Sequence, residues 1–316
     1  MKDTFGRSIT YLRLSITELC NLRCRYCMPE NGVPKRAHAE LMTEEEMIQA
    51  VEAAAALGIT KVRITGGEPL TKPNVISICR RTAAVKGIQE TDLTTNGIRL
   101  PEMAKPLAEA GVSRINMSLD TLDDEKYRKI TRGGRLSQAL SGLQAALKAG
   151  FSKIKINAVL IGGFNDDEIE TLAYLTKIYP VDMRFIELMP MPGLPGFDSE
   201  SYISAESVLT HLPEAEKIGT EGVARLYRLP GAQGNIGLIS PVSCHFCREC
   251  NRIRLTADGH LKPCLHSRDE ICIRGMNFEE MKEAFAQAIS MKPKQHDPLS
   301  AREMTQSARS MNRIGG

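Results

Sequence analysis

Three closely spaced cysteines have the clearest chemical potential of any residues in this sequence. Cys20, Cys24 and Cys27 lie in the segment Cys-Asn-Leu-Arg-Cys-Arg-Tyr-Cys. Three thiolates can hold three irons of a four-iron cubane and leave the fourth iron open, whereas most such clusters have four cysteine ligands. A zinc site is disfavoured, because structural zinc is closed by four ligands and no histidine or fourth cysteine stands nearby. The spacing therefore predicts a reactive cluster that can bind a small molecule.

The composition indicates a cytosolic protein with a sizeable core. The chain has 316 residues, of which 42% are hydrophobic, enough for one large domain or one and a half. The first residues carry no secretory signal, and no run of about eighteen apolar residues predicts a membrane span. We therefore expect a cytoplasmic location, where thiols stay reduced. A net charge of +3 is too small to argue for nucleic acid, although it allows a local basic pocket for a small anion.

One pattern recurs three times along the chain: a helix that ends in glycine, two further residues, and then a strand. The glycines are Gly58, Gly111 and Gly150, and the strands after them alternate apolar and polar residues. A capping box at Thr43 begins another helix. Further strands are predicted at 11–16, 89–94 and 181–188, and further helices at 101–110, 135–149 and 166–178. Six strands that alternate with helices predict a parallel sheet covered by helices.

One face of this sheet is predicted to be polar and cationic. The residues in this phase are Arg13, Arg63, Thr65, Asn116, Ser118, Lys155 and Asn157. Helices must cover the opposite, apolar face, so the polar face suggests an open partial barrel lined for a polar ligand. An ordinary eight-stranded barrel instead fills its lumen with branched side chains. A solvated sheet face is the alternative explanation.

The chemistry-bearing segments follow the carboxyl ends of the strands, where ligands of such sheets bind. The cysteine segment follows the first strand, and Gly66-Gly67-Glu68-Pro69 follows the second. The cysteine spacing, Tyr26 before the last cysteine and the Gly-Gly-Glu-Pro segment together resemble the radical S-adenosylmethionine superfamily. The resemblance implies an open iron that chelates S-adenosylmethionine, reductive cleavage to a 5′-deoxyadenosyl radical, and a six-unit partial barrel.

A second cysteine set at residues 244–264 leaves more than one metal open. Cys244, Cys247, Cys250 and Cys264 could form a closed zinc ribbon, and spacing alone does not exclude it. The first three also match the ferredoxin spacing, but position 254, where that motif has its next cysteine, is an arginine. Arg252 and Arg254 lie on one face of a predicted strand. Guanidinium groups there suit a carboxylate, a phosphate or a purine edge.

This second set, with Asn-Arg-x-Arg after Cys250, resembles one radical S-adenosylmethionine family nearly from end to end: the GTP 3′,8-cyclases of molybdenum cofactor biosynthesis. The resemblance implies two [4Fe–4S] clusters, the second held by Cys247, Cys250 and Cys264 with an open iron at the guanine. It implies that the adenosyl radical removes hydrogen from ribose C3′ and that C3′ then attacks C8. The product would be (8S)-3′,8-cyclo-7,8-dihydroguanosine 5′-triphosphate. Cys244 would be a spectator or an exchangeable ligand.

The resemblance also assigns residues to ligands. Contacts to S-adenosylmethionine are expected from Tyr26, Gly66, Gly67, Glu68, Ser118 and Met189. Contacts to GTP are expected from Arg13, Arg63, Thr94, Lys155, Arg252 and Arg254. Gly315, Gly316 and Arg313 of the Gly-Gly tail are expected in the active site as catalytic residues. Strand phase had already placed Arg13, Arg63 and Lys155 in the lumen.

The expected fold class is α/β, a partial six-unit (β/α) barrel of the triose-phosphate-isomerase type closed by a C-terminal iron–sulfur domain. The barrel is expected at 1–230 and the cluster region with its tail at 231–316. Expected partners are GTP as substrate, an electron donor of the flavodoxin or ferredoxin type, and a downstream cyclic pyranopterin monophosphate synthase. Neither nucleic acid nor a membrane is expected, and a homodimer is allowed.

Two alternative functions remain at this stage. One is another radical enzyme with an auxiliary cluster, such as a peptide-modifying maturase, although those carry a longer cysteine-rich tail and lack Asn-Arg-x-Arg. The other is a non-enzymatic, zinc-stabilised binding module. Metal content separates them, because two cubanes need about eight irons per chain.

Overall fold

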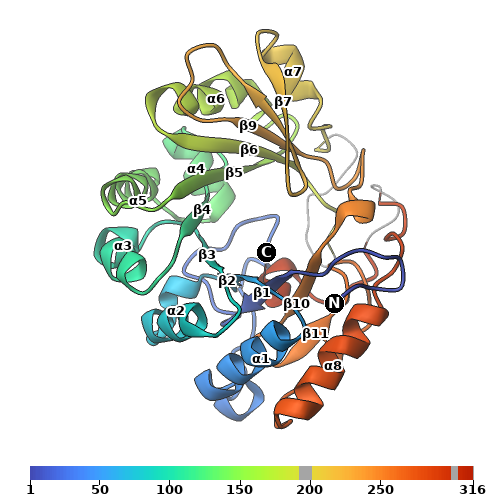
Figure 1. Ribbon diagram of the computed structural model, residues 1–316. Coiled ribbons are helices and arrows are strands. Elements are labelled where there is room, and N and C mark those ends of the chain that lie inside the picture. The colour runs from blue at the N-terminus through green and yellow to red at the C-terminus, as the bar shows by residue number, and fades with distance from the viewer. Residues whose placement is uncertain (192–200, 300–304, 316) are drawn as a thin grey trace.

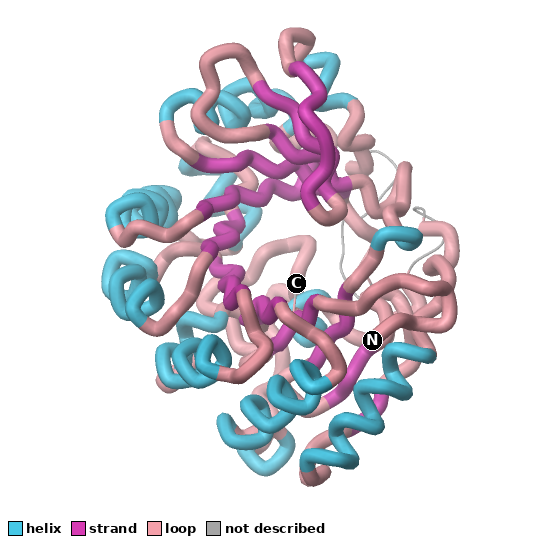
Figure 2. Tube along the Cα trace, viewed as in Figure 1, coloured by secondary structure: helices cyan, strands magenta, loops and turns pink. Residues whose placement is uncertain are grey.

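The strands of the protein form one curved sheet that surrounds an open lumen. The computed structural model describes residues 1–191, 201–299 and 305–315. Its sheet is 12-stranded in the order β12-β11-β10-β1-β2-β3-β4-β5-β6-β9-β8-β7. Helices lie on the outer side of the curve and the strands face inward (Figures 1 and 2). The two end strands, β12 and β7, do not pair among the described residues, so the barrel is partial, as predicted.

Six β/α units form the central part of the sheet, and adjacent strands in it are parallel. The strands are β1 Tyr11–Ser15, β2 Lys61–Thr65, β3 Glu90–Thr95, β4 Arg114–Ser118, β5 Lys153–Leu160 and β6 Val181–Glu187. The helices are α1 Glu44–Ala56, α2 Val75–Ala84, α3 Leu100–Glu109, α4 Asp124–Thr131, α5 Leu136–Lys148 and α6 Ile169–Ile178. All six predicted strands are therefore confirmed, together with the four helices expected from capping and periodicity.

Local sequence explains where these helices begin. Thr43 and Glu46 form the predicted capping box: Thr43 Oγ1 accepts from the Glu46 backbone N–H at 3.1 Å, and a Glu46 carboxylate oxygen accepts from Thr43 N–H at 2.8 Å. Asp123 caps α4 in a similar way by accepting from Lys126 N–H at 2.8 Å. These two caps fix where α1 and α4 begin after the loops that follow β1 and β4.

The apolar phase of the strands packs against the helices, as predicted. Val62, Ile64, Ile115 and Ile156 are fully buried in a single core. Burying such side chains contributes about 1.5–3 kcal/mol each. The opposite phase, which carries the arginines and asparagines, faces the lumen.

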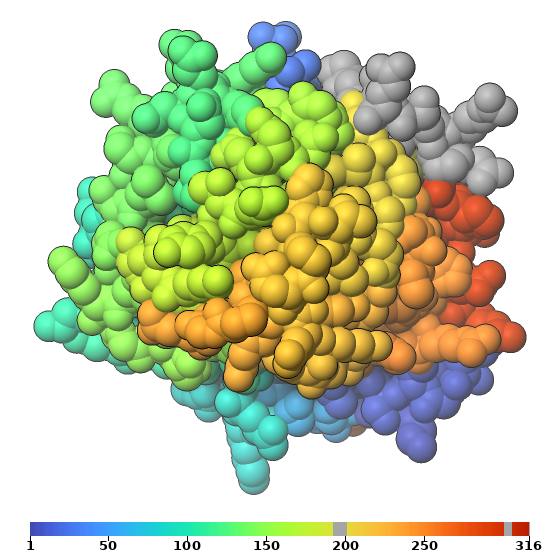
Figure 3. All heavy atoms as spheres, turned by 90° about the horizontal axis from the view of Figure 1, so that it is seen from above, coloured from blue at the N-terminus to red at the C-terminus, as the bar shows by residue number. Residues whose placement is uncertain are grey.

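Each side of the six-unit barrel is extended by one more parallel strand and an antiparallel pair. On one side β9 Ile236–Ile239 pairs with β6, followed by β8 Ala224–Arg228 and β7 Glu216–Glu221. On the other side β10 Arg252–Leu255 pairs with β1, followed by β11 His260–Lys262 and β12 Ile271–Cys272. Seen from above, the β7–β9 segment lies in the middle of the visible face (Figure 3). The sheet runs continuously across the expected boundary at 230/231, and that boundary stays a prediction.

The C-terminal segment returns to the barrel. Helix α8 Phe278–Ser290 packs beside α1, although the two are far apart in sequence (Figure 1). The short helix α9 Met311–Ile314 then brings Gly315 into the open barrel, beside Ser15 and Thr65. The remaining elements are α7 Ser207–His211 and the 3-10 turns η1 His38–Glu40, η2 Pro69–Thr71, η3 Asp166–Glu168 and η4 Cys247–Glu249. Within the described ranges, no helix combines the length and apolar character needed to cross a membrane.

Candidate active site

Both cysteine triads open into one cavity. Cys20, Cys24 and Cys27 line it from the loop after β1. Cys247, Cys250 and Cys264 line it from the segments around β10 and β11. The cavity has a volume of about 300 Å³. Cys244 is exposed and is not among the lining residues, and its role as a spectator or an exchangeable ligand stays a prediction.

The first triad is held by backbone contacts to helix α4. Arg23 N–H donates to Thr131 O at 3.0 Å, and Arg25 N–H donates to Ile130 O at 2.9 Å. Burial raises the pKa of Cys20 to about 11 and that of Cys27 to about 12. Thiolates are the form that binds metal, so these sulfurs need a nearby cation to ionise. Three half-buried thiols on one short loop fit an iron–sulfur cluster that supplies this charge.

Gly66 and Gly67 are required by the close approach of this cysteine loop. A Cβ at Gly67 would lie 2.4 Å from Leu19 O, and one at Gly66 would lie 2.5 Å from Thr17 O. Gly67 N–H also donates to Thr17 O at 2.8 Å. The Gly-Gly segment thus fixes the residues that lead into Cys20 while its own backbone lines the cavity.

Glu68 serves mainly to hold the neighbouring loops. Its carboxylate accepts from Thr95 Oγ1 at 2.8 Å, from Asn96 N–H at 2.7 Å and from Leu70 N–H at 3.0 Å. Burial raises its pKa to about 7. The loop after β3 is therefore tied to the loop after β2, and both reach the cavity.

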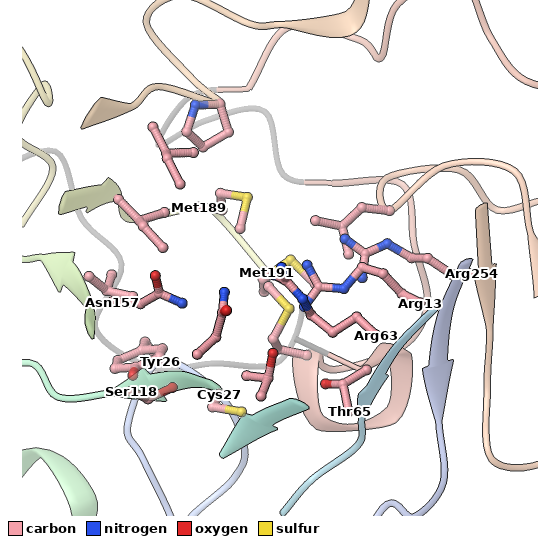
Figure 4. Close-up of a pocket in the computed structure, with 18 of the residues that line it drawn as sticks. Arg13, Tyr26, Cys27, Arg63, Thr65, Ser118, Asn157, Met189, Met191 and Arg254 are labelled. Carbon is pink, nitrogen blue, oxygen red and sulfur yellow. The ribbon is translucent and has the colours of Figure 1, made fainter. Parts of the chain in front are cut away.

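Tyr26 and Asp120 form a hydrogen-bonded pair beside the first triad. Tyr26 OH donates to Asp120 Oδ2 at 2.7 Å, and Val159 N–H donates to Asp120 Oδ1 at 2.9 Å. Burial raises the pKa of Asp120 to about 6. Tyr26, Ser118 and Asn157 lie on the side of the cavity near Cys27, with Met189 opposite them (Figure 4).

Three buried arginines stand side by side across the lumen. Arg254, Arg13 and Arg63 are in register on β10, β1 and β2, and each is less than a tenth exposed. Burial, followed by the charge of Arg254, holds the pKa of Arg13 well below its ordinary value. Burial, followed by the charge of Arg252, lowers the pKa of Arg254 to about 10. Their guanidinium groups gather on one side of the cavity (Figure 4), where crowded positive charge favours an anion.

A further group of charges joins β5 and β6 to the β7–β8 hairpin. Lys155 Nζ donates to Glu221 Oε2 at 2.7 Å, and Arg184 donates to the same oxygen at 2.8 Å. Burial, followed by the charge of Arg184, lowers the pKa of Lys155 to about 7. Arg184 lines the cavity, whereas Lys155 is covered and does not. An anionic ligand that reaches this group would compete with Glu221 for both cations.

Several buried polar atoms around the lumen have no hydrogen-bond partner within the described part of the chain. They are the amide nitrogen and oxygen of Asn116, Thr94 Oγ1, Asn157 Oδ1 and Arg252 Nε. Native proteins pair nearly all buried polar groups. These atoms come from four different strands and lie around one cavity, so they fit a polar ligand that would supply the missing partners.

The second triad has a different electrostatic environment from the first. Burial raises the pKa of Cys247 and of Cys264. At Cys250 the effect of burial is outweighed by the positive charges of Lys292 and Arg252, and its pKa is lowered. The donor set again fits an iron–sulfur cluster, with Arg252 and Arg254 beside it on β10.

The C-terminal tail reaches the arginine row. Arg254 donates to Gly315 O at 2.8 Å, and Asn312 Nδ2 donates to Glu18 O at 3.0 Å. Arg313 lies against Glu18, with 3.5 Å between Nε and a carboxylate oxygen, and is not among the cavity-lining residues. Gly316 lies outside the described residues. A catalytic role for Gly315, Gly316 and Arg313 stays a prediction.

Sequence reasoning assigned no role to four residues that the structure brings to this region. Arg184 has the same strand phase as Asp182 on β6, so the period-two rule could have found it. Asp120 lies two residues after the end of β4, at the ligand-binding end of the sheet. Glu221 on the β7–β8 hairpin and Lys292 after α8 carry no motif, and only the folded chain places them.

Comparisons with known proteins agree with this geometry. The radical SAM superfamily matches residues 14–175, and a domain described as Molybdenum Cofactor Synthesis C matches residues 181–298. The chain is 49% identical to a GTP 3′,8-cyclase of Alkaliphilus metalliredigens and 44% identical to one of Moorella thermoacetica, each over 100% of both chains. One from Clostridium botulinum is 40% identical over the same full lengths.

Solved structures share the fold. Streptococcus suis SuiB bound to S-adenosylmethionine matches with a TM-score of 0.63 at 16% identity, over 88% of this chain and 65% of that chain. The present chain thus spans less than two thirds of that protein. Native anSMEcpe with bound AdoMet matches with a TM-score of 0.55 at 15% identity, over 92% of this chain and 82% of that chain. At these identities the likeness shows the fold alone.

Proposed function

Because the chain belongs to the GTP 3′,8-cyclase family of the radical SAM superfamily, we propose that it cyclises GTP to (8S)-3′,8-cyclo-7,8-dihydroguanosine 5′-triphosphate. This is the first step of molybdenum cofactor biosynthesis. The cofactors are two [4Fe–4S] clusters and S-adenosylmethionine. When bound, the first cluster and S-adenosylmethionine supply a 5′-deoxyadenosyl radical.

One observation carries the proposal: two cysteine triads and a row of buried arginines share a single cavity. A radical source alone explains the first triad but not three crowded guanidinium groups. A zinc module needs neither an anion site nor a second open triad. A nucleoside triphosphate between two clusters accounts for all three features, because its phosphates neutralise the cations and its base can reach the second triad.

Different cations bind different parts of the substrate. Arg13 and Arg63 bind the phosphates in the lumen, and Lys155 binds them where Glu221 now lies. Arg252 and Arg254 orient the purine beside Cys250 and the second cluster. Thr94, with an unpartnered hydroxyl, donates to the ribose or phosphates. Several fixed charges at different depths place the ribose in one orientation, and orientation accounts for much of the rate of such reactions.

S-adenosylmethionine binds on the opposite side of the cavity, near the first triad. Tyr26 and Ser118 line this side, Gly66 and Gly67 present backbone groups to it, and Met189 contacts the ligand from the wall opposite Tyr26 and Ser118. Glu68 acts through the loops that it holds in place. The walls of the partial barrel and the C-terminal tail keep water from the radical, which otherwise would be quenched.

The proposed cellular setting follows from this chemistry. Each turnover needs an electron for the first cluster, and a small donor of the flavodoxin or ferredoxin type supplies it. The unstable product passes to a cyclic pyranopterin monophosphate synthase. The nine free thiols suit the reducing cytoplasm.

The test is an anaerobic incubation of the cluster-loaded protein with GTP, S-adenosylmethionine and dithionite. Mass analysis should find 5′-deoxyadenosine together with an isomer of GTP that carries the 3′,8 bond. Cys20→Ser should abolish both products, because it removes one of three ligands of the first cluster. Cleavage of S-adenosylmethionine at the normal rate by Cys20→Ser would refute the assignment of this triad.

A further inference from the structure

Lys292 is a buried lysine that neither the motifs nor the proposed reaction uses. It follows helix α8, its residue is only 3% exposed, and it lines the cavity beside Cys250 and Cys264. Its ammonium group donates to Arg252 O at 2.7 Å and to Pro263 O at 2.8 Å. The third neighbour of Nζ is Cys250 Sγ at 3.9 Å.

These contacts join the segments that carry two of the second-triad cysteines. Arg252 begins β10 two residues after Cys250, and Pro263 immediately precedes Cys264. One side chain from α8 therefore holds the segments of both cysteines at a fixed separation. An ammonium group has three donors, and two carbonyls and a sulfur can use all of them.

The charge of Lys292 has no carboxylate partner: in the described ranges, no acidic oxygen lies within 4.0 Å of its Nζ. A buried ammonium without a counter-ion is costly. The nearest group that can carry negative charge is the sulfur of Cys250, as a thiolate ligand. A fixed positive charge and a hydrogen bond at a cluster sulfur favour the more negative, reduced form of the cluster.

We propose that Lys292 is a positioning residue of the second cluster, which fixes the Cys250 and Cys264 segments and raises the reduction potential of that cluster. The proposal rests on the proposed function, because it takes the second triad to hold a cluster. It assigns Lys292 no contact with GTP and no proton transfer.

The experiment compares Lys292→Met, which keeps the length and loses the charge, with Lys292→Arg, which keeps the charge. Lys294→Met is the control, since Lys294 is exposed and two residues away. Full-length proteins are reconstituted with both clusters, and the resonance signal of the second cluster is identified as the one lost in Cys264→Ser. Iron content, the reduction potential of this signal and S-adenosylmethionine cleavage are then measured.

We expect Lys292→Met to cleave S-adenosylmethionine normally, which shows that it is folded with its first cluster. Its second cluster should be harder to reduce, with the ratio of reduced to oxidised protein falling about tenfold at a fixed potential, the worth of one charge-assisted hydrogen bond. Lys292→Arg should recover most of the loss, and Lys294→Met should match the unaltered protein.

If Lys292→Met instead loses the second cluster while cleavage persists, the fixing of the two segments is supported, and the potential of Lys292→Arg then tests the effect of the charge. An unchanged potential and iron content in Lys292→Met would overturn the proposal. These readouts do not depend on GTP turnover. A chain that reduces its clusters as expected but forms no cyclic product would refute the proposed function and leave this inference standing.

Discussion

At the scale of single residues, Arg13 is a buried charge that lowers the stability of the unliganded protein and favours the binding of an anion. Its guanidinium is buried between Arg254 and Arg63, its register neighbours on β10 and β2. Burial and then the neighbouring positive charge hold its pKa well below the ordinary value. Arg13 and Arg254 repel each other in the unliganded protein, whereas Arg63 is paired with Asp92 at 2.8 Å, and a bound anion would offset the repulsion.

Arg13→Met should therefore move stability and binding in opposite directions. The neutral side chain relieves repulsion, so the melting temperature of the unliganded protein should rise. GTP affinity should fall about tenfold or more, because a charged contact is worth roughly 1.5–3 kcal/mol. Thermal unfolding and titration calorimetry measure the two effects, and Lys105→Met, on the exposed side of α3, should change neither. Unchanged affinity would mean that the arginine row does not hold the triphosphate.

The lowered pKa of Lys155 predicts a pH dependence of GTP binding. Its pKa is lowered to about 7 in the unliganded protein by burial and then by Arg184, so it is protonated below and neutral above that value. A bound triphosphate favours the charged form, so above about pH 7, where phosphate itself is already ionised, binding must take up a proton.

GTP affinity should therefore fall roughly tenfold between about pH 7 and about pH 8.5. Lys155→Arg should bind GTP with little change over the same range, because arginine stays protonated. Equilibrium dialysis at constant ionic strength measures both proteins. If GTP affinity depended on pH equally in the unaltered protein and in Lys155→Arg, a group other than Lys155 would be responsible.

At the scale of elements, the C-terminal tail that carries α9 is the least ordinary feature. Gly315 has φ +83°, and a Cβ there would lie 2.8 Å from Thr65 Cγ2 and 3.0 Å from Ser15 Cβ. Gly6 has a nearly identical φ of +81° but open space around it. Substitutions at these two glycines therefore distinguish the effect of backbone strain, which both share, from the effect of close packing in the lumen, which only Gly315 has.

Gly315→Ala should lose cyclised product while both clusters and uncoupled cleavage of S-adenosylmethionine persist, because the methyl group displaces the tail from Thr65 and from Arg254. Gly6→Ala carries the same backbone strain and should remain active. Product yield, 5′-deoxyadenosine yield and iron content are measured together. Full product formation by Gly315→Ala would return the tail to the role of an ordinary chain end.

The six central β/α units were predictable from sequence, and the edges of the sheet were not. Period-two alternation placed Arg13 and Arg63 in the lumen correctly, since helices must cover the other face. It could not show that Lys155 is covered by Glu221, because that contact depends on the β7–β8 hairpin. Lys292 likewise reaches the second triad only because α8 packs against α1, and the apolar period of α8 does not specify that partner.

At the scale of the whole molecule, two triads from distant parts of the chain meet across one cavity because β10 pairs directly with β1. Because the two triads are separate, the loss of a second-triad ligand should affect GTP turnover more than S-adenosylmethionine cleavage. Cys264→Ser should impair GTP turnover but retain some uncoupled cleavage of S-adenosylmethionine, whereas Cys244→Ser should keep its activity and iron, because Cys244 lies outside the cavity. An inactive, iron-depleted Cys244→Ser protein would show that the ligand set is wrong.

The measurement that tests the account most directly follows one hydrogen atom across the cavity. The cluster-loaded protein is incubated anaerobically with S-adenosylmethionine, dithionite and GTP that carries deuterium at C3′, and both products are analysed by mass. If the arginine row holds GTP with its ribose toward the first triad, deuterium should appear in 5′-deoxyadenosine, and the cyclised nucleotide should lack it. Formation of 5′-deoxyadenosine without deuterium, or a cyclised nucleotide that keeps it, would contradict the account.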